Sequence, residues 1–278
     1  MKSENTFPLL FTKSIKMRCI SSLLFLCLLT ACQLPRKSVE AVISKDDQQP
    51  VLTISFQTPD SITIIGDVYK VDEKAITILL FHQAGANARG EYHTIIPRLL
   101  EAGYNVFAFD QRVGGQRFGS FNRTMTAIEN NRYGYCDAYP DLNSALDYVI
   151  AQGYTGKKII WGSSYSAALV IQLANKRPED VTAVLAFSPA SGGALENCLP
   201  NPFVEGLKVP LLALRPASEM EYEDVKVQLE MIKSFRHETF VSENGVHGSS
   251  MLVEERTGSD VSKTWEIVMA FLARFKTI

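Results

Sequence analysis

The strongest constraint on the fold of this chain lies in residues 158–170, which read KIIWGSSYSAALV. An apolar run of strand character is followed by small residues around a serine and then by a helical pattern. A sharp turn between a strand and a helix lifts one hydroxyl group above the sheet and places it at the helix N-terminus. Ser164 is therefore the candidate nucleophile, and Gly162 stands where such a turn leaves no space for a side chain.

One residue departs from this pattern. The G-x-S-x-G motif has glycine two residues after the nucleophile, whereas this chain has Ser166. Serine is small, so we interpret Ser166 as a tolerated variant. The competing interpretation is a serine-rich helix N-cap that follows an ordinary strand and has no catalytic role. Other segments of the chain decide between the two.

A second motif follows an apolar run at residues 75–81, AITILLF, which is typical of a buried strand. Residues 82–85, HQAG, come next and precede a helical segment from about Glu91. Here the chain resembles the α/β-hydrolase family, and within it the dienelactone-hydrolase-like and small-esterase members. In that family an HGxG-type turn after the third strand supplies part of the oxyanion hole. The resemblance implies that the backbone N–H groups of Ala84 and Tyr165 point at the developing oxyanion.

A serine hydroxyl is a poor nucleophile at neutral pH, so this hypothesis requires a histidine and an acid after Ser164. His237 and His247 are the candidates. His247 lies in a glycine-punctuated loop, residues 244–250, between an expected last strand at 239–241 and the C-terminal helix. The resemblance places the catalytic histidine in this loop. We interpret His237, at the entrance to the strand, as a solvated strand-edge residue.

The acid is expected after the penultimate strand, which we predict at residues 209–214, VPLLAL. The α/β-hydrolase resemblance implies an acid within a few residues of this strand, where Glu219 stands and Glu221 is the alternative. In the resulting mechanism His247 removes the proton of Ser164 and Glu219 orients the imidazole. The predicted activity is hydrolysis of carboxylic esters or thioesters through an acyl-enzyme, with amide cleavage as a chemical neighbour.

The N-terminus predicts export. Basic residues precede an apolar stretch at 20–29 that is too short to span a bilayer. Residues 29–32, LTAC, resemble the lipobox of bacterial lipoproteins, in which the cysteine is lipidated and becomes the first mature residue. We therefore expect a signal peptide over 1–31, a lipid on Cys32, and attachment to the bacterial cell envelope, at the outer membrane of a Gram-negative host. A simple signal peptide or an uncleaved anchor are the alternatives, and Met17 is an alternative start.

The rest of the chain is expected to form a tether and one domain. Residues 32–50 are polar and lack a hydrophobic period, as a flexible tether does. Residues 51–278 alternate strand and helix patterns, which predicts an α/β domain with a mostly parallel sheet and helices on both faces. Cys136 and Cys198 are the cysteines left in this domain, and an oxidising compartment favours a disulfide between them. Both follow strand C-terminal ends, so we expect this disulfide above the substrate pocket.

No metal or cofactor is expected. His82 and His93 are far apart in sequence, and the chain has neither an H-E-x-x-H motif nor cysteines at zinc spacing. The net charge of −2 and the lack of a basic patch argue against nucleic-acid binding, so the expected partners are a small acyl substrate and the membrane, with the protein a monomer. The alternative to an enzyme is a catalytically silent lipoprotein that uses the hydrolase fold as a binding module, because Ser166 and Gln83 both stand where glycine is usual.

Overall fold

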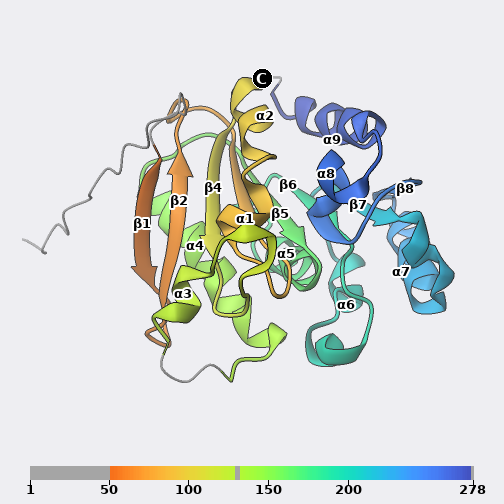
Figure 1. Cartoon of the computed structure of the whole chain (residues 1–278), viewed down its shortest axis with the longest axis horizontal. Helices are drawn as coiled ribbons and strands as arrows, with labels where there is room; N and C mark the ends of the chain where they lie inside the picture. The colour runs from red at the N-terminus through yellow and green to blue at the C-terminus, as the bar shows by residue number, and fades with distance from the viewer. Residues whose placement is uncertain (1–50, 129–131, 277–278) are drawn as a thin grey trace, which may run out of the picture. The chain divides into compact units, whose positions relative to one another are not determined.

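An eight-stranded sheet in the order β1-β2-β4-β3-β5-β6-β7-β8 organises the domain (Figure 1). The computed structural model describes residues 51–128 and 132–276. The predicted signal peptide at 1–31, the lipidation site at Cys32 and the tether to residue 50 lie outside these residues. The strands are β1 (Leu52–Gln57), β2 (Thr63–Tyr69), β3 (Thr77–Phe81), β4 (Asn105–Asp110), β5 (Lys158–Ser163), β6 (Ala183–Phe187), β7 (Leu211–Pro216) and β8 (Glu238–Ser242).

The sheet is antiparallel at one edge and parallel elsewhere. β1 pairs with β2 and β2 with β4 in antiparallel register. From β4 onward every pairing is parallel. Strands of a parallel sheet are covered on both faces, and every residue of β3, β4 and β6 is buried. The predicted mostly parallel sheet is therefore confirmed.

Helices cover both faces of the sheet. Successive side chains of a strand point to opposite faces, so Leu79 and Phe81 enter one hydrophobic core while Ile78 and Leu80 enter the other. The first core is closed by α4 (Tyr139–Ala151), α5 (Tyr165–Lys176), α6 (Asn201–Val204) and α7 (Glu223–Ser234). The second core is closed by α1 (Ala88–Tyr92), α2 (Ile96–Glu101) and α9 (Ser262–Ala273), and two further short helices are α3 (Arg123–Thr126) and α8 (Glu254–Thr257).

Two element boundaries differ from the sequence prediction for local reasons. The strand predicted at 209–214 is β7, which begins after Pro210, because proline has no N–H group to donate to the ladder. The helix expected from about Glu91 is α1 and begins at Ala88, because the side chain of Asn87 caps it by accepting the N–H of Gly90 at 2.7 Å. Among the described residues, no helix combines the length and apolar character that crossing a membrane requires.

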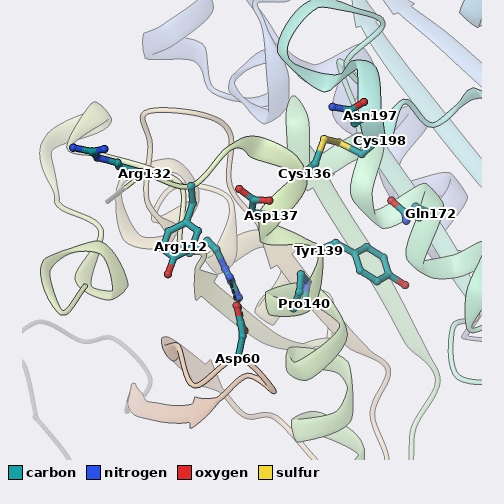
Figure 2. A pocket seen from close by; sticks show the side chains of 11 residues that line it. Asp60, Arg112, Arg132, Cys136, Asp137, Tyr139, Pro140, Gln172, Asn197 and Cys198 are labelled. Carbon is teal, nitrogen blue, oxygen red and sulfur yellow. Dashed lines mark hydrogen bonds and ion pairs between the residues drawn. A yellow bond between two sulfur atoms is a disulfide. The ribbon is translucent and has the colours of Figure 1, made fainter. Parts of the chain in front are cut away.

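A buried arginine after β4 connects the end of this strand to α4 and to the turn between β1 and β2. The Nε atom of Arg112 donates to Asp141 at 2.8 Å, and its Nη1 atom lies 2.5 Å from a carboxylate oxygen of Asp60. Burial raises the pKa of Asp141 to about 6, although Arg112 acts in the opposite direction. Figure 2 shows this arginine at the wall of a cavity of about 660 Å³, whose other lining residues include Tyr139, Gln172, Cys136 and Cys198.

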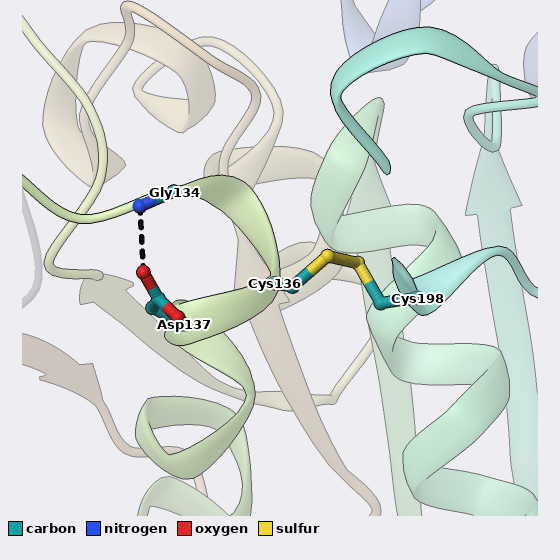
Figure 3. Close-up of a disulfide and its surroundings, with 4 residues drawn as sticks. All are labelled: Gly134, Cys136, Asp137 and Cys198. Atoms are coloured by element: carbon teal, nitrogen blue, oxygen red, sulfur yellow. Dashed lines mark hydrogen bonds between the residues drawn. A yellow bond between two sulfur atoms is a disulfide. The ribbon is translucent and has the colours of Figure 1, made fainter. Parts of the chain in front are cut away.

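A disulfide joins the two long excursions of the chain. Cys136 precedes α4, and Cys198 lies in the loop between β6 and α6 (Figure 3). Their Cα atoms are 5.6 Å apart. The two cysteines are 62 residues apart in sequence, so the bond closes a large loop. In the chain-entropy model a loop of this length stabilises the fold by about 4 kcal/mol.

Replacing both Cys136 and Cys198 with serine is therefore expected to lower the free energy of unfolding by up to about 4 kcal/mol, because the unfolded chain regains the entropy of the open loop. Urea unfolding of unreduced protein measures this difference. Reducing agent should destabilise the wild type to a similar extent and leave the double variant unchanged. Two alkylated thiols in unreduced wild-type protein from an oxidising compartment would contradict the disulfide.

Candidate active site

Ser164 occupies a strained turn between β5 and α5. Its φ of 62° and ψ of −118° place it in a backbone region that is costly for residues other than glycine. The N–H of Ser164 donates to the carbonyl of Phe187, at the end of β6, at 2.8 Å. A Cβ atom on Gly162 would lie 2.5 Å from the carbonyl oxygen of Ser166, so only glycine fits there. The turn has the geometry of a nucleophile elbow.

Ser166 has a role that glycine cannot perform. Its side chain is buried, and its Oγ atom accepts the N–H of Ser163 at 2.8 Å and donates to the carbonyl of Phe81 at 2.7 Å. These bonds connect the C-terminal ends of β3 and β5. The departure from the G-x-S-x-G pattern therefore adds a link between two central strands and leaves the turn intact.

His247 and Glu219 lie side by side at this end of the sheet. The Nδ1 atom of His247 is 2.6 Å from Oε1 of Glu219. Because an ionised carboxylate only accepts hydrogen bonds, Nδ1 carries the hydrogen and Nε2 keeps the lone pair that a base needs. Glu221, the alternative acid, is exposed and makes no hydrogen bond to His247 within the described ranges.

Arg215 fixes the other oxygen of Glu219. This arginine is buried in β7, and its Nη1 atom lies 2.7 Å from Oε2 of Glu219. Its Nη2 atom donates to the side chain of Gln228 at 2.5 Å and also to the carbonyl of Pro189. Burial opposes ionisation of Glu219, but the hydrogen bonds from His247 and Arg215 outweigh it and lower the pKa of this carboxyl group. Sequence reasoning missed Arg215, although a charged residue inside an apolar strand was a usable signal.

Ser164 and His247 line the same pocket, which has a volume of about 350 Å³. Its remaining lining comes from the start of the loop after β6 and from Glu219 and nearby residues: Ser188, Ala190, Ser191, Gly192, Gly193, Arg215, Glu219, Tyr222, Asp224 and Val225. In the part of the chain that the structure describes, no hydrogen bond joins the Ser164 hydroxyl to the His247 ring. In free enzymes such bonds are often long and tighten only when substrate binds.

The turn after β3 and the start of α5 provide the N–H groups proposed for the oxyanion. The N–H of Gln83 donates to the carboxylate of Glu91 at 2.7 Å and is therefore occupied. Among the described residues, the N–H groups of Ala84 and Tyr165 have no hydrogen-bond partner. Tyr165 is the first residue of α5, where backbone N–H groups have no partner inside the helix.

His82, in the turn after β3, has a structural role. His82 is buried, its Nδ1 atom donates to the carbonyl of Gln83 at 2.9 Å, and its Nε2 atom accepts the N–H of Gln111 at 3.1 Å. Burial lowers the pKa of His82, so the ring is neutral and links the ends of β3 and β4. The prediction that His237 is solvated is wrong. Its Nε2 atom is buried, and desolvation lowers the pKa of the ring.

The predicted position of the disulfide above the substrate pocket is also wrong. Cys136 and Cys198 line the larger cavity of Figure 2, and neither is among the described residues that line the Ser164 pocket. The reason is the course of the loop after β6. Ser188 and residues 190–193, at its start, line the Ser164 pocket, whereas Cys198 lies further along the loop and is bonded to Cys136, which precedes α4. The disulfide therefore holds the far end of this loop.

The family of the chain follows from comparison with known proteins. Residues 72–246, more than half of the chain, match the family model described as serine aminopeptidase, S33. The chain belongs to this family of serine hydrolases. The match ends one residue before His247, so this histidine is assigned by its position and its contact with Glu219. A comparison with curated proteins found no match.

Solved structures confirm the α/β-hydrolase fold. An esterase from Pyrococcus furiosus has a TM-score of 0.63 and 17% identity, over 87% of this chain and 97% of that one. A thermostable carboxyl esterase from Bacillus coagulans has a TM-score of 0.64 and 12% identity, over 81% of this chain and 98% of the other. A dienelactone hydrolase from Anabaena variabilis has a TM-score of 0.58 and 14% identity, over 78% of this chain and 96% of that one.

Replacing Arg215 with methionine is expected to move the acid limb of the pH–rate profile to higher pH. In the wild type the hydrogen bonds from Arg215 and His247 lower the pKa of Glu219, so its carboxylate persists as the pH falls. Without the arginine, only His247 opposes the effect of burial, so the pKa of Glu219 rises and this group becomes protonated at a higher pH. The variant should therefore lose more activity at pH 5 than at pH 8, relative to the wild type. In Arg215→Lys, which keeps a positive charge, the acid limb of the pH–rate profile should shift less. A profile of unchanged shape in Arg215→Met would contradict this role of Arg215.

Proposed function

We propose that this protein is a lipid-anchored serine hydrolase of the bacterial cell envelope that cleaves carboxylic esters or thioesters through an acyl-enzyme. One observation carries the proposal: His247 and Glu219, 2.6 Å apart, line the same pocket as Ser164, which stands at a strained turn. A nucleophile, a base and an acid that orients the base are the groups this chemistry requires. Their order in the chain, serine, acid and histidine, is that of α/β-hydrolases.

In the proposed mechanism the Oγ atom of Ser164 attacks the acyl carbonyl and its proton passes to Nε2 of His247. Glu219 stabilises the imidazolium, and the N–H groups of Ala84 and Tyr165 stabilise the oxyanion. The imidazolium then protonates the leaving alcohol or thiol, which departs as the acyl-enzyme forms. Water attacks the acyl-enzyme, gives its proton to His247, and releases the carboxylic acid together with the free serine.

Esters are the favoured substrates because the Pyrococcus furiosus and Bacillus coagulans structures are those of esterases. The pocket, at about 350 Å³, lies near the lower end of the usual range for ligand sites, which favours short acyl groups. The family description names an aminopeptidase, which supports cleavage of an amide beside a free amino group as a second candidate. A binding module without catalysis is the remaining alternative.

A panel of p-nitrophenyl esters of increasing chain length tests the activity, with aminoacyl p-nitroanilides for the second candidate. Short-chain esters are expected to react fastest.

His247→Ala should lower kcat/KM by roughly 10³-fold or more, because the serine then has no base. His237→Ala is the matched control, since His237 is not among the described residues lining the pocket, and it should retain wild-type kcat. Equal losses in the two variants would contradict the assignment, and an inactive wild type would favour the binding module.

The envelope location rests on the leader sequence and agrees with a disulfide in an oxidising compartment. Replacing Cys32 with serine removes the thiol that the lipid requires, so the protein should move from the membrane fraction to the soluble fraction. Cell fractionation followed by immunoblotting measures this. Cys27→Ser, a change in the same leader at a position that is not lipidated, should leave the protein in the membrane fraction. Membrane retention of the Cys32 variant would show that another feature anchors the protein.

A further inference from the structure

A buried carboxyl group that the triad mechanism does not use lies next to the turn after β3, residues 82–85, which we call the oxyanion turn. The side chain of Glu91, in α1, is fully buried. Its Oε2 atom accepts the backbone N–H of Gln83 at 2.7 Å, and its Oε1 atom accepts the side-chain amide of Gln83 at 3.2 Å. The hydroxyl of Ser163 also acts to lower the pKa of this carboxyl group. Every one of these partners can donate a hydrogen bond to an ionised carboxylate.

These contacts connect Glu91 to the segment that carries Ser164 and to the loop that carries His247. Ser163 immediately precedes Ser164, and its Oγ atom accepts the N–H of Ser249 at 2.9 Å. Because that oxygen accepts from Ser249, its own hydrogen is free to point at Glu91. The loop packs tightly here, since a Cβ atom on Gly248 would lie 2.4 Å from the same oxygen.

Arg256 completes the surroundings of this carboxyl group. Its Nη1 atom donates to the backbone carbonyl of Glu91 at 3.0 Å and to the hydroxyl of Ser250 at 3.3 Å. Its Nη2 atom donates to the carbonyl of Gly90 at 2.7 Å. The guanidinium therefore ties α1 to the loop after His247 and places a positive charge near the carboxylate of Glu91.

We propose that Glu91 is a positioning residue. It fixes the relative positions of the oxyanion turn, the segment that carries Ser164 and the loop that carries His247. It does not touch the reacting atoms. By occupying the N–H of Gln83, it fixes the turn in which the next N–H, that of Ala84, has no partner among the described residues. The inference rests on the proposed function, because the relative positions of these three segments affect the rate only if they act together in catalysis.

The chemistry of the side chain supports a role beyond packing. Burial raises the pKa of Glu91, and the hydrogen bonds from Ser163 and Gln83 act in the opposite direction. A buried carboxylate is costly for stability unless hydrogen bonds and nearby positive charge compensate for it. Glutamine at this position would turn its own N–H groups toward one of the donors, and that donor would lose its acceptor.

The test is Glu91→Gln, assayed with a short-chain ester and normalised by titrating active serines with a fluorophosphonate. Kcat per active site is expected to fall roughly 10- to 100-fold, because a small displacement of the reacting groups slows the chemical step. KM should stay within about threefold, since Glu91 does not contact substrate. Any loss of stability from the donor left without an acceptor lowers the melting temperature and not kcat per active site. A merely structural role would lower the melting temperature and the titratable fraction and leave kcat per active site unchanged.

Two further variants complete the design. Asp141→Asn, a matched change of a buried carboxylate outside the site, should alter stability and keep kcat. Ser163→Ala removes the link to Ser249 and should also lower kcat. In the double variant Glu91→Gln/Ser163→Ala, the fold-loss in kcat should be smaller than the product of the two single losses, because both residues act through one network. If Glu91→Gln does not fold, Ser163→Ala carries the test. Wild-type kcat in Glu91→Gln and Ser163→Ala would overturn the proposal and leave the proposed function standing. An inactive, unlabelled wild type would overturn both.

Discussion

The parallel register of the central strands is the constraint on which the candidate site depends. Phe81 at the end of β3 pairs with Gly162, Ser163 with Phe187, and Phe187 with Leu214. The residues that follow these strands therefore meet at one edge of the sheet, as the C-terminal ends of parallel strands do. The turn after β3, Ser164, the start of the loop after β6 and Glu219 all lie at this edge, although they are far apart in sequence.

The same edge concentrates groups that cost stability. Ser164 has a positive φ, the guanidinium of Arg215 is buried in β7, and Glu91 is a buried carboxylate. Each is held by neighbours that are themselves fixed: the carbonyl of Phe187 for Ser164, and Glu219 together with Gln228 for Arg215. The two hydrophobic cores on either face of the sheet supply the stability that offsets these costs.

Short motifs next to strands made the parallel fold and several candidate residues predictable from the sequence. Ser164, Glu219 and His247 each follow a strand within a few residues, so hydrophobic runs and small-residue turns were enough to propose them. The structure places His247 against Glu219 and leaves Glu221 exposed, a choice that depends on how the turn after β7 folds.

Other features depend on contacts that no local pattern encodes. The carboxylate of Glu91 meets the N–H of Gln83 because α1 packs against β3 and β4. The link that Ser166 makes to Phe81 likewise joins residues far apart in sequence. The disulfide pair was predictable from the cysteine count, but its place beside the larger cavity follows from the path of the loop after β6. The half-buried ring of His237 also reflects tertiary packing, which sequence position did not indicate.

The central claim is that one serine of the elbow is activated by His247. Peptide mapping by mass spectrometry after reaction with a fluorophosphonate tests it most directly, because Ser163, Ser164 and Ser166 lie within a few residues of one another and the fragment ions distinguish them. The account predicts a single adduct on Ser164 in the wild type and a strongly reduced rate of its formation in His247→Ala. An adduct on another serine, or equal labelling in the two proteins, would contradict it.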